Sequence, residues 1–126
     1  MNRILLIEDN ELNLDLTVRY LEHFAYEVRT ATDGVAGLDR AVAEHADLDL
    51  ILLDMNLPEM DGWEVARRLK ANEATKSIPV VALTAHAMVG DREKTLAAGC
   101  DEYASKPVDF QALLQKIQNL ISKAAV

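Results

Sequence analysis

Disulfide pairs and long hydrophobic runs are both missing from this sequence. The chain holds one cysteine, Cys100, so an internal disulfide is impossible and a reducing compartment is expected. No charged leader precedes the first apolar run, and no hydrophobic stretch approaches the length of a membrane span. We therefore predict a cytoplasmic protein with neither a signal peptide nor a transmembrane helix.

Basic side chains are also scarce, with 13 lysines and arginines against 21 acids and a net charge of −8. Because binding to a nucleic acid backbone needs a basic surface, direct contact with nucleic acid is disfavoured. An acidic surface attracts metal cations and basic partners, although acidity is also common among ordinary soluble proteins. With no linker, repeat or low-complexity segment, residues 1–126 are expected to form one domain without an output domain.

Apolar runs alternate strictly with helical patterns along the whole chain. We expect five strands, at residues 3–8, 27–31, 48–53, 78–83 and 101–105. We expect five helices, at residues 11–25, 34–45, 62–70, 87–97 and from about 109 to 121. This alternation predicts an α/β fold, in which helices cover both faces of a parallel sheet.

The order of the strands follows from their composition. The runs 4–7, 50–53 and 80–83 are the most apolar and should be central, whereas 27–31 and 101–105 should be edges. Right-handed crossovers then favour the order 2-1-3-4-5, a flavodoxin-like doubly wound (βα)5 arrangement. Its switch point lies between the first and third strands, where such sheets bind their ligands.

Polar residues stand where these strands end. Glu8 and Asp9 follow the first strand, Asp54 the third, Thr84 the fourth and Lys106 the fifth. Because parallel strands end at one rim, these side chains should converge there. Acids, a hydroxyl and a lysine together indicate a site for a divalent cation and a phosphoryl group.

The candidate nucleophile is Asp54, whose carboxylate can accept a phosphoryl group as an aspartyl-phosphate. Mg²⁺, for which Mn²⁺ can substitute, prefers the oxygen ligands that Glu8, Asp9 and Asp54 offer. Lys106 and the Thr84 hydroxyl would contact the phosphoryl oxygens. Each residue alone has a structural alternative, because acids and threonines after strands often cap helices or form turns. Their occurrence together favours the site.

Four segments resemble the response regulator receiver domains of two-component and phosphorelay signalling: Glu8-Asp9, residues 54–62, Thr84-Ala85 and Lys106-Pro107. The resemblance extends from Ile4 to about Ile121. The stretches that open on Glu8 and Thr84 are similar to those of single-domain regulators of the cell-cycle or chemotaxis type. Glu8 departs from the common pattern, because many receivers carry an aspartate there.

The resemblance implies roles for further residues. The backbone carbonyl of Asn56 would be another metal ligand, and the amide of Ala85 would assist in phosphoryl binding. Asn56 and His86 would tune the lifetime of the phosphoryl group. Tyr103 would turn inward as Thr84 moves toward the phosphoryl group; its structural alternative is an edge-strand aromatic packed on the last helix. The Lys106-Pro107 bond would be cis.

The resemblance further implies a phosphorylation-controlled binding module. It would take the phosphoryl group from a phosphohistidine of a histidine kinase or phosphotransfer protein and contact a downstream effector through the 87–121 face. It would not be an enzyme beyond its own phosphorylation and autodephosphorylation.

Two alternatives compete with this interpretation. A small aspartyl-phosphate phosphatase is disfavoured because we find no second acid positioned as a general acid beside Asp54 and no cap domain, and Asn56 stands where an Asp-x-Asp phosphatase needs a carboxylate. A module that binds without phosphorylation is disfavoured by the intact Asp54, Thr84 and Lys106.

Overall fold

The computed structural model describes residues 2–57, 60–84 and 91–124. Within them the strands and helices alternate: β1 (Arg3–Ile7), α1 (Glu11–His23), β2 (Glu27–Ala31), α2 (Gly34–Ala43), a 3-10 turn (His45–Asp47), β3 (Leu50–Asp54), α3 (Gly62–Ala71), β4 (Val80–Thr84), α4 (Asp91–Ala97), β5 (Glu102–Ser105) and α5 (Phe110–Ala124). None of the helices in this described part is both long and apolar enough to cross a bilayer.

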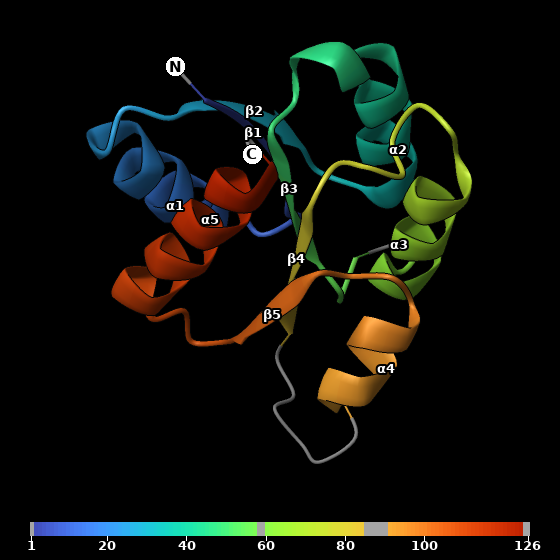
Figure 1. The fold of residues 1–126 in the computed structure, drawn as a ribbon. Coiled ribbons are helices and arrows are strands. Elements are labelled where there is room, and N and C mark those ends of the chain that lie inside the picture. The colour runs from blue at the N-terminus through green and yellow to red at the C-terminus, as the bar shows by residue number, and fades with distance from the viewer. Residues whose placement is uncertain (1, 58–59, 85–90, 125–126) are drawn as a thin grey trace.

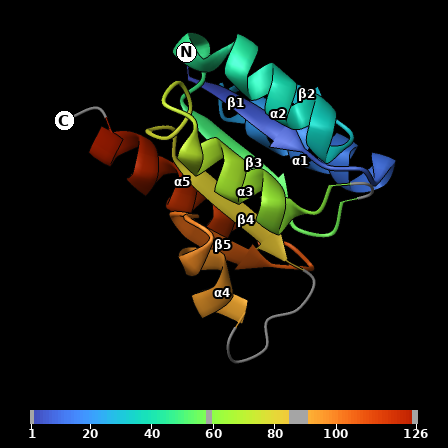
Figure 2. The same ribbon diagram turned by 90° about the vertical axis from the view of Figure 1, so that its right-hand side faces the viewer.

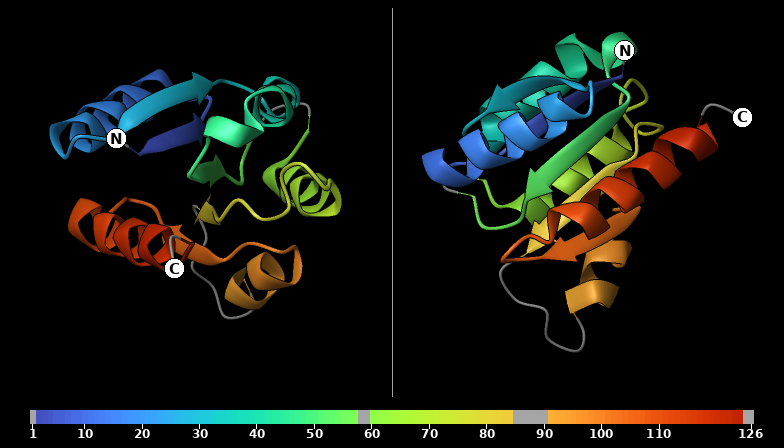
Figure 3. Two further views of the ribbon diagram at one scale, coloured as in Figure 1. Left: turned by 45° about the horizontal axis from the view of Figure 1, so that its top comes forward. Right: turned by 90° about the vertical axis from the view of Figure 1, so that its left-hand side faces the viewer.

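The five strands form one parallel sheet in the order β2-β1-β3-β4-β5, which confirms the predicted fold class and strand order. Helices α1 and α5 cover one face, and α2, α3 and α4 cover the other (Figures 1 and 3). The view in Figure 2 looks onto α2 and α3 with the sheet behind them. The molecule is therefore a three-layer sandwich.

Successive strand residues point to opposite faces, so the alternation of side chains builds two separate cores. On β1, for example, Leu5 and Ile7 point to one face and Ile4 and Leu6 to the other. The first core is closed by residues of α2 and α3 and by Ala98 and Cys100, which follow α4, and the second by Leu21, Leu113 and Ile117 of α1 and α5. All five residues of β3 and all five of β4 are buried, as the central position predicted from their apolar runs requires.

Several element boundaries differ from those predicted. The helix expected over 11–25 ends at His23, because Ala25 takes a left-handed φ of 68° and its amide donates to the carbonyl of Glu22. The amide of Tyr26 donates to the carbonyl of Leu21, which completes a Schellman-type end without glycine. The helix expected over 34–45 likewise ends at Ala43, before the 3-10 turn.

The third strand begins two residues later and ends one residue later than predicted, so it includes Asp54, which pairs with Leu83. The fourth begins after Pro79 and includes Thr84, β1 and β5 are each one residue shorter than expected, and β2 has the predicted bounds. Of the helix predicted over 87–97, only Asp91–Ala97 is described, and residues 87–90 lie outside the described part. The last helix continues to Ala124.

The turn after β3 is held by a close approach at Gly62. A methyl group there would lie 2.4 Å from the Met55 Cα and 2.7 Å from the carbonyl oxygen of Asp54, so only glycine fits. Asp61 caps α3, since its carboxylate accepts a hydrogen bond from the amide of Glu64 at 2.9 Å. The start of α3 is therefore fixed against the backbone that carries Asp54.

Gly62→Ala should lower the free energy of unfolding by about 1–3 kcal/mol, because a β-carbon would force backbone away from backbone. Urea denaturation followed by circular dichroism would measure the change. Ala71→Ser, at the exposed end of the same helix, should stay within about 0.5 kcal/mol of the parent protein. Equal stabilities for both variants would contradict the packing described here.

Candidate functional site

Three predicted residues meet at the carboxyl ends of strands β1, β3 and β5. Glu8 follows β1, Asp54 ends β3, and Lys106 follows β5. The Lys106 Nζ lies 3.2 Å from Asp54 Oδ2 and 3.3 Å from Glu8 Oε1. The amide of Lys106 also donates to the carbonyl of Thr84 at 2.8 Å, which anchors the lysine to the end of β4. The sheet order therefore brings residues almost one hundred positions apart into contact.

The two carboxylates in this contact are almost completely withdrawn from water. Glu8 is 2% exposed and Asp54 is 1% exposed, and the Thr84 side chain beside them is also buried. Two ionised acids in one buried site would repel each other and lose their hydration. The single cation Lys106 can balance only one of them.

The site resolves this conflict by holding a proton between the acids. Burial raises the pKa of Glu8 to about 7, and the hydrogen bond and negative charge of Asp54 act in the same direction. Burial alone would also raise the pKa of Asp54, but the hydrogen bonds from Glu8 and from the Asn56 amide, together with Lys106, hold it below its usual value. Asp54 is thus the ionised member of the pair, as a nucleophile must be.

Glu8 lies close to Asp54, as the convergence of the strand ends predicted, and both carboxylates contact Lys106. With a cation bound, Glu8 would be ionised and would have no proton to donate to a leaving group, so it does not supply the general acid that a phosphatase needs. Asn56 remains an amide in the place where a phosphatase needs an acid.

A divalent cation fits the donor set. Glu8, Asp9 and Asp54 each offer a carboxylate oxygen, and these oxygens lie within 4.8 Å of one another. Two oxygens bound to one Mg²⁺ at about 2.0–2.1 Å can be at most about 4.2 Å apart. The three carboxylate oxygens would therefore have to move only slightly closer together to bind the ion. Asp9 is exposed and gives the ion access from solvent.

Asn56 takes part through its backbone. Its amide donates to Asp54 Oδ1 at 3.0 Å, which fixes the rotamer of the nucleophile, while its side chain is exposed above the site. The proposed metal ligand, its carbonyl oxygen, stays a prediction. Ala85 and His86, the two remaining residues predicted to contact or tune the phosphoryl group, lie outside the described residues.

Two predictions concern the segment that leads into α5. The peptide bond between Lys106 and Pro107 is cis, as the resemblance implied. The ring of Tyr103 packs against the core on the side of α2 and α3. Helix α5 contacts it through Lys116, whose Nζ lies 5.4 Å from the ring centroid and 2.6 Å from the Tyr103 carbonyl oxygen.

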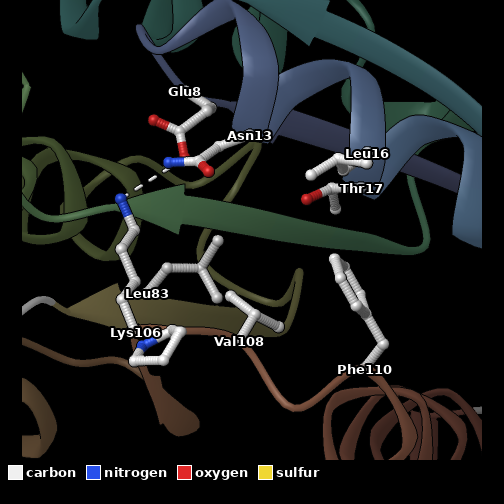
Figure 4. Close-up of a pocket in the computed structure, with 9 residues that line it drawn as sticks. Glu8, Asn13, Leu16, Thr17, Leu83, Lys106, Val108 and Phe110 are labelled. Atoms are coloured by element: carbon white, nitrogen blue, oxygen red, sulfur yellow. Dashed lines mark ion pairs between the residues drawn. The ribbon is translucent and has the colours of Figure 1, made fainter.

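A cavity of about 480 Å³ beside the site was not predicted. Figure 4 shows Glu8 and Lys106 at one end of it and Phe110 at the other. It is also lined by Asn13, Leu16, Thr17, Leu83, Pro107 and Val108. The sequence did hold a signal: Leu12 and Leu16 lie off the buried face of α1, and they are 67% and 47% exposed.

Comparison with known proteins agrees with this geometry. The family model of the response regulator receiver domain matches residues 4–118. The polar-differentiation response regulator DivK of Brucella ovis is 40% identical over 121 residues, which are 96% of this chain and 97% of that protein. DivK of Brucella anthropi is equally similar, with the same identity and coverage.

Solved structures agree as well. The receiver domain of the sensor histidine kinase PA1611 from Pseudomonas aeruginosa PAO1, which has a magnesium ion coordinated in its active site cleft, superposes with a TM-score of 0.88. It is 36% identical, and the match covers 96% of this chain and 98% of that one. The chemotaxis protein CheY4 of Vibrio cholerae gives a TM-score of 0.86 at 28% identity, covering 95% and 98%.

The matches to these solved structures cover nearly the whole of this chain. Since the family model extends from the first strand into the last helix, the chain belongs to the family of response regulator receiver domains.

Proposed function

We propose that Asp54 accepts a phosphoryl group from a phosphohistidine of a histidine kinase or histidine phosphotransfer protein, in a reaction that needs Mg²⁺. The observation that carries the proposal is the pairing of a buried, ionised Asp54 with Lys106 at 3.2 Å, next to a carboxylate cluster that suits a hard cation. A nucleophilic carboxylate, a fixed positive charge and a metal site are the parts that phosphoryl transfer to an acid requires.

In the proposed reaction one oxygen of Asp54 attacks the phosphorus atom. A P–O bond forms, the P–N bond to the donor imidazole breaks, and the imidazole keeps the bonding electrons and leaves carrying its proton. Lys106, already against the carboxylate, neutralises charge that gathers on the phosphoryl oxygens. A cation held by Glu8, Asp9 and Asp54 would supply the remaining positive charge.

The donor would approach across the cavity between α1 and the start of α5. This surface is continuous with the site, since Glu8 and Lys106 line it, and its other walls are largely apolar. Leu12 and Leu16 extend the apolar surface onto the exposed side of α1. A helix of the protein that presents the phosphohistidine could cover these side chains while its histidine reaches Asp54.

We further propose that phosphorylation changes how the face formed by α4, β5 and α5 binds an effector protein. Thr84 ends β4 and pairs with Ser105 of β5, and Lys106 joins β5 to α5. Drawing Thr84 and Lys106 toward one phosphoryl group would therefore act on both ends of this segment, where Tyr103 lies. The modification adds about −1.5 to −2 charges, enough to bias a two-state surface.

In this role the protein turns over no substrate other than its own phosphoryl group, and it works in the cytoplasm. The single thiol supports that location, since Cys100 is buried and unpaired with any other cysteine. The similarity to DivK proteins and to a chemotaxis protein supports a stand-alone regulator of either kind.

Incubation with acetyl phosphate and Mg²⁺ should add one phosphoryl group, seen as a single mass increase of the intact protein. Asp54→Ala and Asp54→Asn should abolish it, because neither side chain forms an acyl phosphate. Asp15→Asn, an exposed acid of α1, is the matched control and should be phosphorylated normally. Lys106→Ala should be phosphorylated poorly while it still binds Mg²⁺. A full mass increase in Asp54→Ala would refute the assignment.

Leu16→Ala should slow phosphorylation by a phosphorylated histidine phosphotransfer protein about fivefold, because it removes apolar surface that the donor covers. Phosphorylation of the same variant by acetyl phosphate should be unchanged, since that small donor needs no docking surface. Val42→Ala, an exposed apolar residue on α2, should behave like the parent protein with both donors. If Leu16→Ala and Val42→Ala give equal rates with the protein donor, the cavity is not the docking surface.

Mg²⁺ affinity should rise with pH, because below about pH 7 the ion must displace the proton on Glu8. The affinity at pH 6 should be about tenfold weaker than at pH 8. Titration followed by Trp63 fluorescence would measure it, and calorimetry in two buffers would detect the released proton. Glu8→Gln should bind more weakly and without this pH dependence, whereas the exposed Glu11→Gln should match the parent. A flat profile in the parent protein would rule out Glu8 as a ligand that must ionise.

A further inference from the structure

The outer edge of β5 is closed by side chains at one residue, Tyr103. Its amide donates to Glu102 Oε1 at 3.0 Å, and its carbonyl accepts a hydrogen bond from Lys116 Nζ at 2.6 Å. Unpaired backbone groups on an edge strand otherwise invite pairing with another chain. Lys116 comes from α5, on the opposite face of the sheet from the core against which the Tyr103 ring packs.

The same ammonium also contacts the ring. Lys116 Nζ lies 5.4 Å from the centroid of the Tyr103 ring, inside the range of about 6 Å in which a cation is attracted to an aromatic face. Tyr103 and Lys116 are both partly exposed, so neither is locked by burial. One flexible side chain thus touches both the backbone and the ring of a single residue.

Lys116 cannot easily follow the ring if the ring moves. Its own helix is anchored by Leu113 and Ile117, which are 1% and 0% exposed. Its ammonium is tied to the Tyr103 carbonyl by a short, charge-assisted bond. With 5.4 Å already close to the limit of attraction, a turn of the ring away from α5 would lose the cation–π contact while the carbonyl bond stays.

In the same structure Lys106 pairs directly with the Asp54 carboxylate at 3.2 Å. This inference rests on the function proposed above: we propose that Lys116 is a positioning residue of the switch, which stabilises the Tyr103 ring in the position described here and so opposes its movement on phosphorylation of Asp54. Only contacts that differ between two states shift their balance, so the cation–π contact acts on the switch and the carbonyl bond does not.

The test compares Lys116→Met, which keeps the length of the side chain but loses its charge, with Lys116→Arg, which keeps the charge and the donors. Beryllofluoride with Mg²⁺ serves as the phosphoryl mimic. The signal is the ring resonance of ¹³C-labelled Tyr103, assigned by its loss in Tyr103→Phe. Lys123→Met, which alters an exposed lysine of the same helix, is the matched control.

In Lys116→Met, the beryllofluoride concentration that gives half of the change in the Tyr103 ring resonance should be about two- to fivefold lower than in the parent protein. The reason is that the cation–π contact no longer opposes movement of the ring. Lys116→Arg and Lys123→Met should stay at the parent midpoint. Urea denaturation of each variant separates this effect from a general loss of stability. A lower stability of Lys116→Met with an unchanged midpoint would overturn the proposal.

Two further outcomes also decide the matter. If Lys116→Arg shifts as far as Lys116→Met, the positive charge is not responsible and the proposal is wrong. If signals around Asp54 respond to beryllofluoride while the Tyr103 ring of the parent protein stays still, the phosphoacceptor site stands and this inference falls. If no signal responds in the parent protein, the proposed function fails first and this inference fails with it.

Discussion

The structure depends on one buried electrostatic arrangement, in which Lys106 faces Glu8 and Asp54 across the carboxyl ends of three strands. Two buried acids facing one cation leave one negative charge in excess. Burial, together with the hydrogen bond and charge of Asp54, raises the pKa of Glu8 to about 7, whereas the hydrogen bonds of Asp54 and the charge of Lys106 hold the pKa of Asp54 below its usual value. A metal ion can replace the proton on Glu8, because both satisfy the same surplus of negative charge.

This arrangement can form only because of the sheet order. β1 lies beside β3 and β3 beside β4, so the residues that follow these strands share one rim. The apolar cores on both faces make the central strands rigid, and they hold Asp54 and Thr84 at nearly zero exposure. Rigid strands with reactive groups at their ends position the chemistry, while the surrounding loops admit ions and partners.

The fold was predictable because it follows from features that repeat along the chain. Strict alternation of strands and helices fixed the class, and the contrast between apolar runs such as 50–53 and polar ones such as 101–105 separated central from edge strands. The residues Glu8, Asp54 and Lys106 were found because each follows a strand. The end of α1 was missed, because Ala25 takes a conformation that glycine usually signals. The contact between Lys116 and Tyr103 was missed because it depends on the path of a long side chain around the sheet edge.

β5 differs from the other strands in how it is held, and this difference gives the fold a part that can move. On one side it pairs with β4, which is completely buried, and its end is tied through Lys106 to the reactive rim. On the other side its backbone is bonded by the side chains of Glu102 and Lys116 and not by a further strand of the described sheet. In the proposed function, a change at Asp54 would therefore reach the surface through β5, because this strand joins the reactive rim on its inner side and side chains at the surface on its outer side.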